Sequence, residues 1–505
     1  MRFRIFAHAW LLVILLCSQP AAARSIAVPP GGDLQSAIMT AQAGDTIELT
    51  AGAVYTGNFT LTDHGGEGFV TIRTAESAGQ PQAGARISPD HAPLLAKIRT
   101  TSNEPAIQTA SNAHHWRLTL LDIESGPVSN GEIVALGSGS ALQASMIPHH
   151  IELDRLYIHA DVRAGRVRGV ALNSASTTIT GSYISEIKAV GQDSQAIGGW
   201  NGPGPYVISN NYLEAAGENL LFGGSDPRVP DLVPSDITIV NNTMSKQLSW
   251  RNQSWSVKNI LELKNARRVT IVGNTLEYNW QGGQSGYAVL FTVRNQDGGC
   301  PWCQVDHVVF RRNVVKNIAA GIQILGIDNN FPSRQTQAIE IRDNVFAGID
   351  NERWGGNGYF ITLAGNPRDI TVDHNTIITE HGSGLVQVDG PPVLGFTFTN
   401  NIGKHSAFGI IGSGRAIGLD TIRSFFPGSN IVSNVMAGGS PDRYPNGNLF
   451  PNVRQFEEQF ESYTSSDFRL RAGSPWRRAG TDGRDLGAGF TELPGPREPR
   501  SPIAN

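Results

Sequence analysis

The chain has few cysteines, few charged residues and no long hydrophobic run beyond its N-terminus. Of its 505 residues, 17% are charged and 3 are cysteines. No segment reaches the ~20 consecutive apolar residues that a transmembrane helix needs, so we expect no membrane span. The net charge is −4 at pH 7 and neither end carries a basic run. Because nucleic acids and anionic membranes attract clustered positive charge, the sequence argues against both partners.

Glycine and proline are abundant, with 57 and 28 residues, while 40% of the chain is hydrophobic. That glycine and proline content is above average but below the level typical of low-complexity disorder. A chain of this length would ordinarily divide into two or three domains, because a single core stops growing near ~250–300 residues. Repeat proteins escape this limit, since each unit buries its apolar face against its neighbours only.

The N-terminus has the pattern of a secretory signal peptide. Arg2 and Arg4 are followed by an apolar core at residues 10–16 and by three alanines at 21–23. This order of charge, apolar core and small residues predicts cleavage after Ala23. We therefore expect a mature protein that is periplasmic or extracellular.

Two cysteines would remain after cleavage, Cys300 and Cys303, in the sequence Gly-Gly-Cys-Pro-Trp-Cys. A C-x-x-C pair can be a redox site, but that interpretation requires a thioredoxin-like βαβ setting, which is missing here. In an oxidising compartment the pair favours a small disulfide that fixes a loop. Redox chemistry and a metal site remain the alternatives.

A short alternating apolar run followed by asparagine recurs about every 31 residues. Ser182, Arg155 and Asp122 take the same place further upstream, which gives about eleven units between residues 118 and 434. Such a period indicates a repeat architecture. The marker asparagines are Asn211, Asn242, Asn274, Asn313, Asn344, Asn375, Asn401 and Asn434.

Each unit also contains a second strand-like run flanked by glycine, from EIVALG at 132–137 to GIIGSG at 409–414. Alternation over four to six residues is typical of strands. Stacked coils, whose strands pair in parallel with those of the next coil, fit this spacing best. We expect the repeated asparagine to adopt the left-handed conformation of a tight turn and to bond its copy one coil away.

The two ends of the chain resemble those of the right-handed parallel β-helix superfamily of the pectate lyase type. Residues 26–28 and 33–38 precede residues 43–49 as the family's opening strand, capping helix and first coil do, and residues 466–488 resemble its closing segment. The helix would turn four apolar residues to the open core end with i, i+3, i+4, i+7 spacing. These are Leu34, Ala37, Ile38 and Ala41.

The resemblance implies an all-β chain folded as a single-stranded right-handed parallel β-helix of about 10–12 coils with an N-terminal capping helix. We divide the chain into a signal peptide (1–23), an N-terminal cap with the first coils (24–117), the repeats (118–440), and a C-terminal capping segment with a tail (441–505). One fold hosts many functions, so this assignment does not set the chemistry.

The repeat serves as a ruler for the second strands. Aligning Leu261 with Phe291 and Leu263 with Val293 places Lys264 and Arg294 in one outward column on consecutive coils, since strand side chains alternate between faces. Two cations ~4.8 Å apart repel by about 3–4 kcal/mol at an effective dielectric near 20. Either the carboxylate of Glu262 neutralises them, or a bound anion such as a uronic acid carboxylate does.

Tryptophans are concentrated near this pair, with six between residues 200 and 354. Flat aromatic rings suit the apolar faces of sugars, and they also pack loops onto a β-helix. Trp255 and Trp280 are our candidates for sugar contacts, together with Arg251 in the insertion 249–256, which would form a cleft wall over Lys264.

This arrangement resembles the chondroitinase-B and alginate-lyase branch of the β-helix polysaccharide lyases. The resemblance implies that Lys264 and Arg294 act on a uronate beside a calcium ion, for which Glu262, Asn265 and Asp297 are candidate ligands. Arg294 is followed by Asn295 and not by the branch's His-Gly. Asn295, together with Glu262 and Asn265, is assigned to substrate binding.

In the implied reaction, β-elimination, Lys264 removes the C5 proton of a uronate and Arg294 stabilises the enolate-like charge. Like-charge repulsion from Arg294 would favour the neutral amine of Lys264 that a base requires. The expected partner is an acidic polysaccharide or oligosaccharide, and we expect a monomer.

Three other functions stay open. A uronate C5 epimerase would share the first step. A glycoside hydrolase would need two carboxylates about 5–10 Å apart, for which Glu262 with Glu218 or Asp297 are the candidates. A non-catalytic β-helix would bind glycan or serve as a surface scaffold. The doublets His114-His115 and His149-His150 lack metal-ligand spacing and are interpreted as surface residues.

Overall fold

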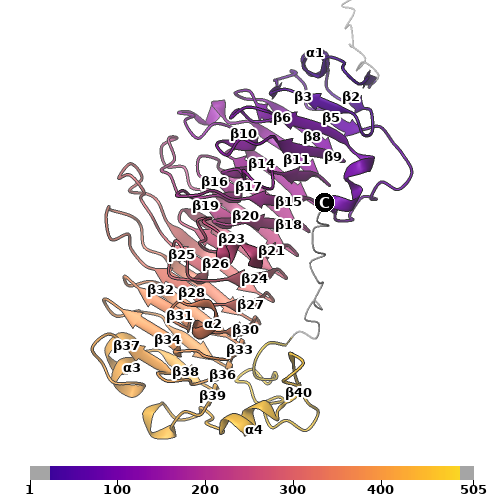
Figure 1. The fold of residues 1–505 in the computed structure, drawn as a ribbon. Coiled ribbons are helices and arrows are strands. Elements are labelled where there is room, and N and C mark those ends of the chain that lie inside the picture. The colour runs from indigo at the N-terminus through magenta and orange to yellow at the C-terminus, as the bar shows by residue number, and fades with distance from the viewer. Residues whose placement is uncertain (1–22, 490–505) are drawn as a thin grey trace, which may run out of the picture.

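The computed structural model describes residues 23–489, and the predicted signal peptide falls almost entirely outside them. The described chain winds into a right-handed parallel β-helix with three long parallel sheets, named here A, B and C. Figure 1 shows the strands stacked in chain order along one axis. The predicted fold class is confirmed. Among the described residues, sheets A and B have 14 and 13 strands, slightly more than the predicted 10–12 coils, and sheet C has 12.

Sheet A is formed by the strand that precedes the marker asparagine in each coil. Its fourteen strands are β1 (Ser25–Val28), β2 (Thr46–Leu49), β5 (Val70–Thr74), β8 (His114–Thr119), β11 (His149–Asp154), β14 (Ala175–Thr180), β17 (Gly204–Ser209), β20 (Ser235–Val240), β23 (Ala266–Val272), β26 (Val305–Arg311), β29 (Gln337–Arg342), β32 (Arg368–Asp373), β35 (Thr397–Thr399) and β38 (Asn430–Val432).

Sheet B follows the marker asparagine after a tight turn, and the sequence pattern did not separate it from sheet A. Its thirteen strands are β3 (Val54–Thr56), β6 (Ala96–Thr100), β9 (Leu121–Ser125), β12 (Tyr157–His159), β15 (Tyr183–Ile187), β18 (Tyr212–Ala215), β21 (Thr243–Ser245), β24 (Thr275–Asn279), β27 (Val314–Ile318), β30 (Val345–Ile349), β33 (Thr376–Thr379), β36 (Ile402–Lys404) and β39 (Val435–Ala437).

Sheet C contains all the second strand-like runs expected from the repeat. Its twelve strands are β4 (Phe59–Leu61), β7 (Ile107–Thr109), β10 (Glu132–Leu136), β13 (Arg168–Leu172), β16 (Gln195–Gly199), β19 (Glu218–Phe222), β22 (Leu261–Leu263), β25 (Tyr287–Thr292), β28 (Ala320–Leu325), β31 (Tyr359–Ala364), β34 (Gly384–Asp389) and β37 (Ile410–Gly412).

The marker asparagines form a continuous buried ladder between sheets A and B. In a typical step, the Nδ2 of Asn274 donates to the Oδ1 of Asn313 at 3.0 Å, and the backbone amide of Asn274 donates to the same oxygen at 2.9 Å. Asn313 in turn donates to the Oδ1 of Asn344 at 3.1 Å. The predicted bond between copies is confirmed, and the ladder extends one step beyond the pattern, to Asn448.

The left-handed residue of this turn is not the ladder asparagine, so that part of the expectation is wrong. The positive φ belongs to the residue before it, for example 56° at Asn241 and 54° at Arg312. The ladder side chain must lie along the helix axis to reach its copies, and the residue before it completes the turn. That residue is exposed at Asn241 and Arg312 but buried at His374 and Asn400.

The two ends of the core are covered by short helices and loops. Helix α1 (Leu34–Thr40) lies at the N-terminal end, where Leu34, Ala37 and Ile38 are buried as predicted, with Ala41 just beyond the helix. Helices α3 (Leu419–Phe425) and α4 (Val453–Glu457), with the hairpin of β40 (Phe460–Ser462) and β41 (Asp467–Leu470), lie at the other end (Figure 1). Helix α2 (Asn351–Trp354) packs against β27.

Several local features complete the fold. In the described part of the chain, four 3₁₀ turns occur in the loops: η1 (Pro89–Leu94), η2 (Ala144–Met146), η3 (Leu248–Asn252) and η4 (Pro441–Arg443). A disulfide joins Cys300 to Cys303 in the loop between β25 and β26, as expected from the pair's setting. Within residues 23–489, no helix has the length and apolar character needed to cross a membrane. The domain boundaries stay a prediction, although sheet strands run from Ser25 to Ala437.

Candidate functional site

Lys264 and Arg294 leave neighbouring coils at the same end of sheet C. Lys264 directly follows β22 and Arg294 follows β25. The backbone amide of Arg294 donates to the backbone carbonyl of Lys264 at 2.9 Å, so the two residues lie side by side in the chain segments beyond the strands.

The strand register beneath them differs from the predicted one by two residues. Leu261 pairs with Val289 and Leu263 with Phe291, not with Phe291 and Val293. A shift of two keeps every side chain on its face, because the strand period is two, so the inward and outward pattern could not detect the error. Glu262 consequently lies in one column with Leu290 and not with Thr292.

Each of the two cations has its own carboxylate. The Nζ of Lys264 lies 3.6 Å from the Oε1 of Glu262, and the Nη1 of Arg294 donates to the Oδ1 of Asp328 at 3.0 Å. Glu262 also accepts from the Nδ2 of Asn259 at 2.9 Å. Of the two alternatives weighed from sequence, Glu262 thus compensates Lys264, while Arg294 is compensated by Asp328, a residue the pattern did not point to.

Lys264 stands at one end of a polar track that crosses the outer face of sheet C over successive coils. Starting from β10, Glu132 accepts from Arg168 at 2.9 Å, and Arg168 donates to the Oε1 of Gln195 at 2.8 Å. Gln195 donates to the Oε2 of Glu218 at 2.9 Å. We define the polar track by the side chains of Glu132, Arg168, Gln195, Glu218, Glu262 and Lys264.

Glu218 is the most unusual group of the polar track. Its side chain is fully buried, and its Oε1 has no hydrogen-bond partner among the described residues. Burial, the charge of Glu262 and the charge of Asp193 raise the pKa of Glu218 to about 7. Lys258 lies 3.9 Å from that oxygen but is held at 2.5 Å by Asp193. Glu218 is therefore a carboxyl that can carry a proton near neutral pH.

Trp200 covers one end of the polar track. The guanidinium of Arg168 lies 5.0 Å from the centre of its ring, and the ring packs tightly on Gly139. Trp200 is partly exposed. The contact with Arg168 joins Trp200 to the polar track.

The tryptophans predicted to contact sugar lie elsewhere. Trp280 is 6% exposed and packs in an apolar cluster with Trp250 and Trp354, with Trp255 at its edge. Arg251 lies 4.9 Å from the ring of Trp354 and donates to a backbone carbonyl at 2.8 Å. This cluster fixes the insertion 249–256 onto the β-helix. Trp250, Trp280 and Trp354 therefore pack a loop, which is one of the two roles considered for the tryptophans. Sugar binding by Trp255, Trp280 and Arg251 stays a prediction.

The residues proposed for calcium and substrate are engaged within the protein. The Oδ1 of Asn265 accepts from the amide of Gln304 at 3.1 Å, and the exposed Asp297 donates its amide to Asp226 at 3.0 Å. Asn295 is buried, and its backbone amide donates to the Oδ2 of Asp328 at 2.7 Å. Because Ca²⁺ takes 6–8 oxygen ligands and no contact joins Glu262, Asn265 and Asp297, the donor set does not fit a calcium ion as it stands, and calcium stays a prediction.

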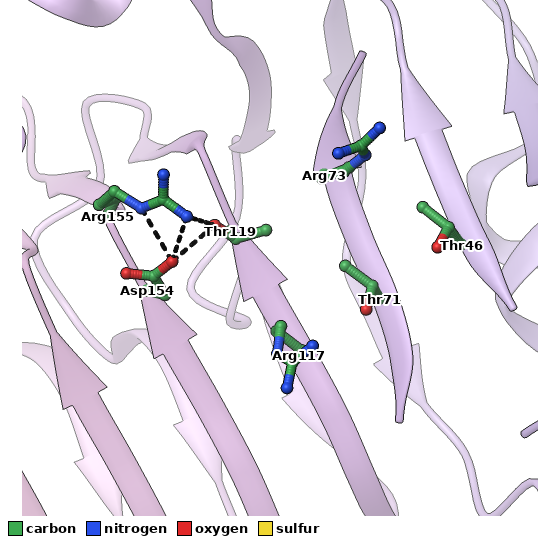
Figure 2. A pocket seen from close by; sticks show the side chains of 7 residues that line it. All are labelled: Thr46, Thr71, Arg73, Arg117, Thr119, Asp154 and Arg155. Atoms are coloured by element: carbon green, nitrogen blue, oxygen red, sulfur yellow. Dashed lines mark hydrogen bonds and ion pairs between the residues drawn. The ribbon is translucent and has the colours of Figure 1, made fainter. Parts of the chain in front are cut away.

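A hollow of about 410 Å³ lies on a different face, over sheet A of the N-terminal coils. Figure 2 shows Arg155 bonded to Asp154 and Thr119, with Arg117 and Arg73 nearby. Arg73 is paired with Glu48 at 2.7 Å and Arg117 with Glu152 at 2.5 Å. Because its arginines are compensated within the protein, we do not assign this hollow to the polar track's chemistry.

No protein-family model matches the chain, and no curated protein matches it. Solved structures resemble its fold. AlyGC, an alginate lyase of the PL6 family, matches with a TM-score of 0.50 and 13% identity, over 93% of this chain and 59% of that one. A mannuronic acid specific family 6 polysaccharide lyase from human gut microbiota matches with a TM-score of 0.47 and 12% identity, over 86% and 93%.

The tailspike protein of E. coli bacteriophage HK620, a mutant in complex with a pentasaccharide, has a TM-score of 0.37 and 13% identity, over 83% of this chain and 62% of that one. At these identities the likeness shows a shared β-helix and not a shared activity. This chain spans 59% of the length of AlyGC, so that enzyme has a large part with no counterpart here.

Proposed function

We propose that the protein is a polysaccharide lyase that cleaves a uronic-acid-containing glycan by β-elimination on the outer face of sheet C. The observation that carries the proposal is the placement of Lys264 and Arg294 on consecutive coils, joined through their backbones at 2.9 Å, at the end of the polar track. The β-helix shared with AlyGC, an alginate lyase, supports it at the level of fold.

In this proposal the substrate carboxylate displaces internal partners of the cations. The side chain of Arg294 is 31% exposed, so a sugar carboxylate at C6 can reach it. In binding that carboxylate, Arg294 exchanges its ion pair with Asp328 for one with the substrate. A guanidinium binds a carboxylate in bidentate fashion, which withdraws charge and acidifies the C5 proton.

Lys264 removes the C5 proton, a double bond forms between C4 and C5, and the C4–O bond breaks. The oxygen that leaves takes a proton, for which the Lys264 ammonium is the nearest donor of the pair. Glu262, 3.6 Å from the lysine nitrogen, positions it and holds the charge that develops there. These are the residues of the chain that the reaction requires; no step is assigned to a metal ion.

The test is an ultraviolet assay for unsaturated uronates over a panel of mannuronate, guluronate, galacturonate and glucuronate polymers. Lys264→Ala is expected to lower the rate by about 10³-fold, the middle of the range for a positioned general base. Lys316→Ala is the matched control, since Lys316 pairs with Glu277 at 3.1 Å on sheet B. A product whose formation is equally fast in both variants would refute the role of Lys264.

A glycoside hydrolase is the second candidate, and Glu218 is the reason. The pKa of the buried Glu218 is raised to about 7, in part by the charge of Glu262. Glu218 could therefore act as the general acid and Glu262 as the second carboxylate that glycoside hydrolysis requires. New reducing ends without an unsaturated product, abolished by Glu218→Gln, would favour this function. C5 inversion without chain cleavage would indicate an epimerase, and binding without turnover would indicate a glycan-binding scaffold.

A further inference from the structure

Four histidines from two consecutive coils meet on the outer face of sheet A, about one coil repeat apart in the sequence. Strands β8 and β11 pair in parallel, with His149 opposite His114. The rings of His114 and His149 stack at 5.0 Å, and those of His115 and His150 at 4.6 Å, each with an interplanar angle of 5°. We call these four residues the histidine quartet.

The backbone explains why both members of each doublet face outward. Successive residues of a regular strand point to opposite faces. His115 and His150, however, have φ of 54°, in the left-handed region. This local irregularity turns the second imidazole to the same side as the first. The sequence doublets therefore gave no metal-ligand spacing, although the fold brings all four rings together.

Three of the four rings bring ligand nitrogens together, and the fourth, His114, is bonded to one of them. The Nδ1 atoms of His114 and His115 are 2.9 Å apart, and those of His149 and His150 are 2.7 Å apart. Ligand atoms of His115, His149 and His150 all lie within 4.8 Å of one another. Neighbouring nitrogens each ~2.0–2.1 Å from one metal ion are about 2.8–3.3 Å apart. Both intra-doublet distances are thus near that of adjacent ligands.

A carboxylate orients one of these rings. Asp63 lies 3.3 Å from the Nε2 of His114, and its other bonds come from Gly65 and Asn112. A proton on Nε2 then leaves the Nδ1 of His114 as a lone pair directed at His115. Metal-binding histidines commonly donate their second ring nitrogen to such a carboxylate, which fixes the tautomer.

His64 adds a further unsatisfied nitrogen at the edge of the quartet. Its ring is 5.4 Å from that of His114, and its Nδ1 is buried without a hydrogen-bond partner among the described residues.

We propose that the histidine quartet binds one first-row transition metal ion, of the zinc, copper or nickel type, through imidazole nitrogens. Imidazole suits these ions, whereas calcium and magnesium require oxygen ligands. Binding moves the proton shared within each doublet to the other nitrogen of the same ring, so that both Nδ1 lone pairs face the ion. The ion then links the coils of β8 and β11, and His64 extends the link to the loop after β4. The site is separate from the polar track, which lies on sheet C, and does not depend on the proposed function.

The test uses the full chain without a histidine tag, titrated with Zn²⁺, Cu²⁺ or Ni²⁺ against a chromophoric chelator. We expect one ion per chain and a rise in melting temperature with metal. His115→Asn with His150→Asn should weaken binding at least tenfold and abolish that rise, since asparagine keeps the left-handed backbone but removes the imidazole. Electron paramagnetic resonance of the Cu²⁺ form should show several nitrogen ligands.

His307→Asn is the matched control, because His307 has φ of 52° at the corresponding position of β26 and lies outside the quartet. Metal-free melting temperatures of the variants monitor folding separately. The proposal is overturned if wild type binds none of the three ions at micromolar concentration. It is also overturned if the double variant and the control bind with the same affinity as wild type.

Discussion

The asparagine ladder and the polar track are both columns of polar side chains that run along the helix axis, yet they differ in composition. The ladder repeats one residue type, and each copy bonds the next in the same way, as Asn313 and Asn344 do. The polar track places acids, bases and amides in succession, and it leaves the Oε1 of Glu218 without a hydrogen bond from any described residue. A self-complementary column stabilises a fold, whereas a mixed one with an unmet group is suited to a ligand.

The largest stability effect is expected from the ladder. Asn313→Ala removes the acceptor for two donors of Asn274 and the donor to Ile271. Each unsatisfied buried polar group costs about 1–3 kcal/mol, so we expect a loss of about 3 kcal/mol in the free energy of unfolding. Urea denaturation measures it, with the exposed Asn252→Ala as control. An equal effect of both variants would remove the distinction between the ladder and other asparagines.

The polar track should respond to pH where the ladder does not. Because the pKa of Glu218 is raised from 4.5 to about 7 in the folded protein, the folded state holds this proton more tightly than the unfolded one. Its stabilising contribution is complete below pH 4.5 and is lost as pH rises through about 7.

We expect Glu218→Gln to remove about 2 kcal/mol of this pH dependence, because glutamine stays neutral at both ends of the window. Glu214→Gln is a useful comparison, since burial and Glu186 raise the pKa of Glu214 to about 7 on a different sheet. Urea unfolding at pH 5 and pH 8 gives the measurement. An unchanged slope in Glu218→Gln would show that Glu218 ionises freely and would weaken its role in the polar track.

Reduction of the disulfide tests the loop beside Arg294. Cys300 and Cys303 are both buried, and the amide of Cys300 bonds the Oδ1 of Asn295, next to Arg294. Replacing both cysteines by serine should cost about 1–2 kcal/mol, because the closed loop is short. Activity toward polysaccharide should fall further in this double serine variant than in Asn313→Ala. The two activities are compared under conditions where both variants are equally folded. Retained activity would separate Arg294 from this loop.

The smallest effect on stability is expected for Trp200→Ala. The ring is partly exposed, and its cation–π contact with Arg168 at 5.0 Å contributes about 0.5–1 kcal/mol to stability. If the polar track binds sugar, oligosaccharide affinity should nevertheless decrease several-fold. Trp354→Ala, in the packed cluster, should show the reverse: a loss of stability without a specific loss of affinity. Calorimetry with acidic oligosaccharides distinguishes these outcomes.

Much of the fold was accessible from periodic asparagine and glycine, whereas the site was accessible only in part. The asparagine period identified the coils, and the glycine-flanked runs all fall in sheet C. The two-residue register error arose because an outward pattern repeats every second residue, so Leu263 fits opposite Val293 as well as opposite Phe291. Asp328 and Gln195 carry no repeat signature, and no sequence pattern could link them to Arg294 or Glu218.

The sequence by itself determined that the chain stacks into parallel coils, because a short repeat can bury its apolar face only against its own copies. It also determined which side chains of each strand face the interior and where the ladder lies. The tertiary structure alone decided which outward side chains meet. Coil lengths vary from 26 to 39 residues between the ladder asparagines from Asn211 to Asn434, and local left-handed residues redirect side chains such as His115. Both depend on how each loop returns to the stack, and that is a property of the packed coil and not of any single repeat.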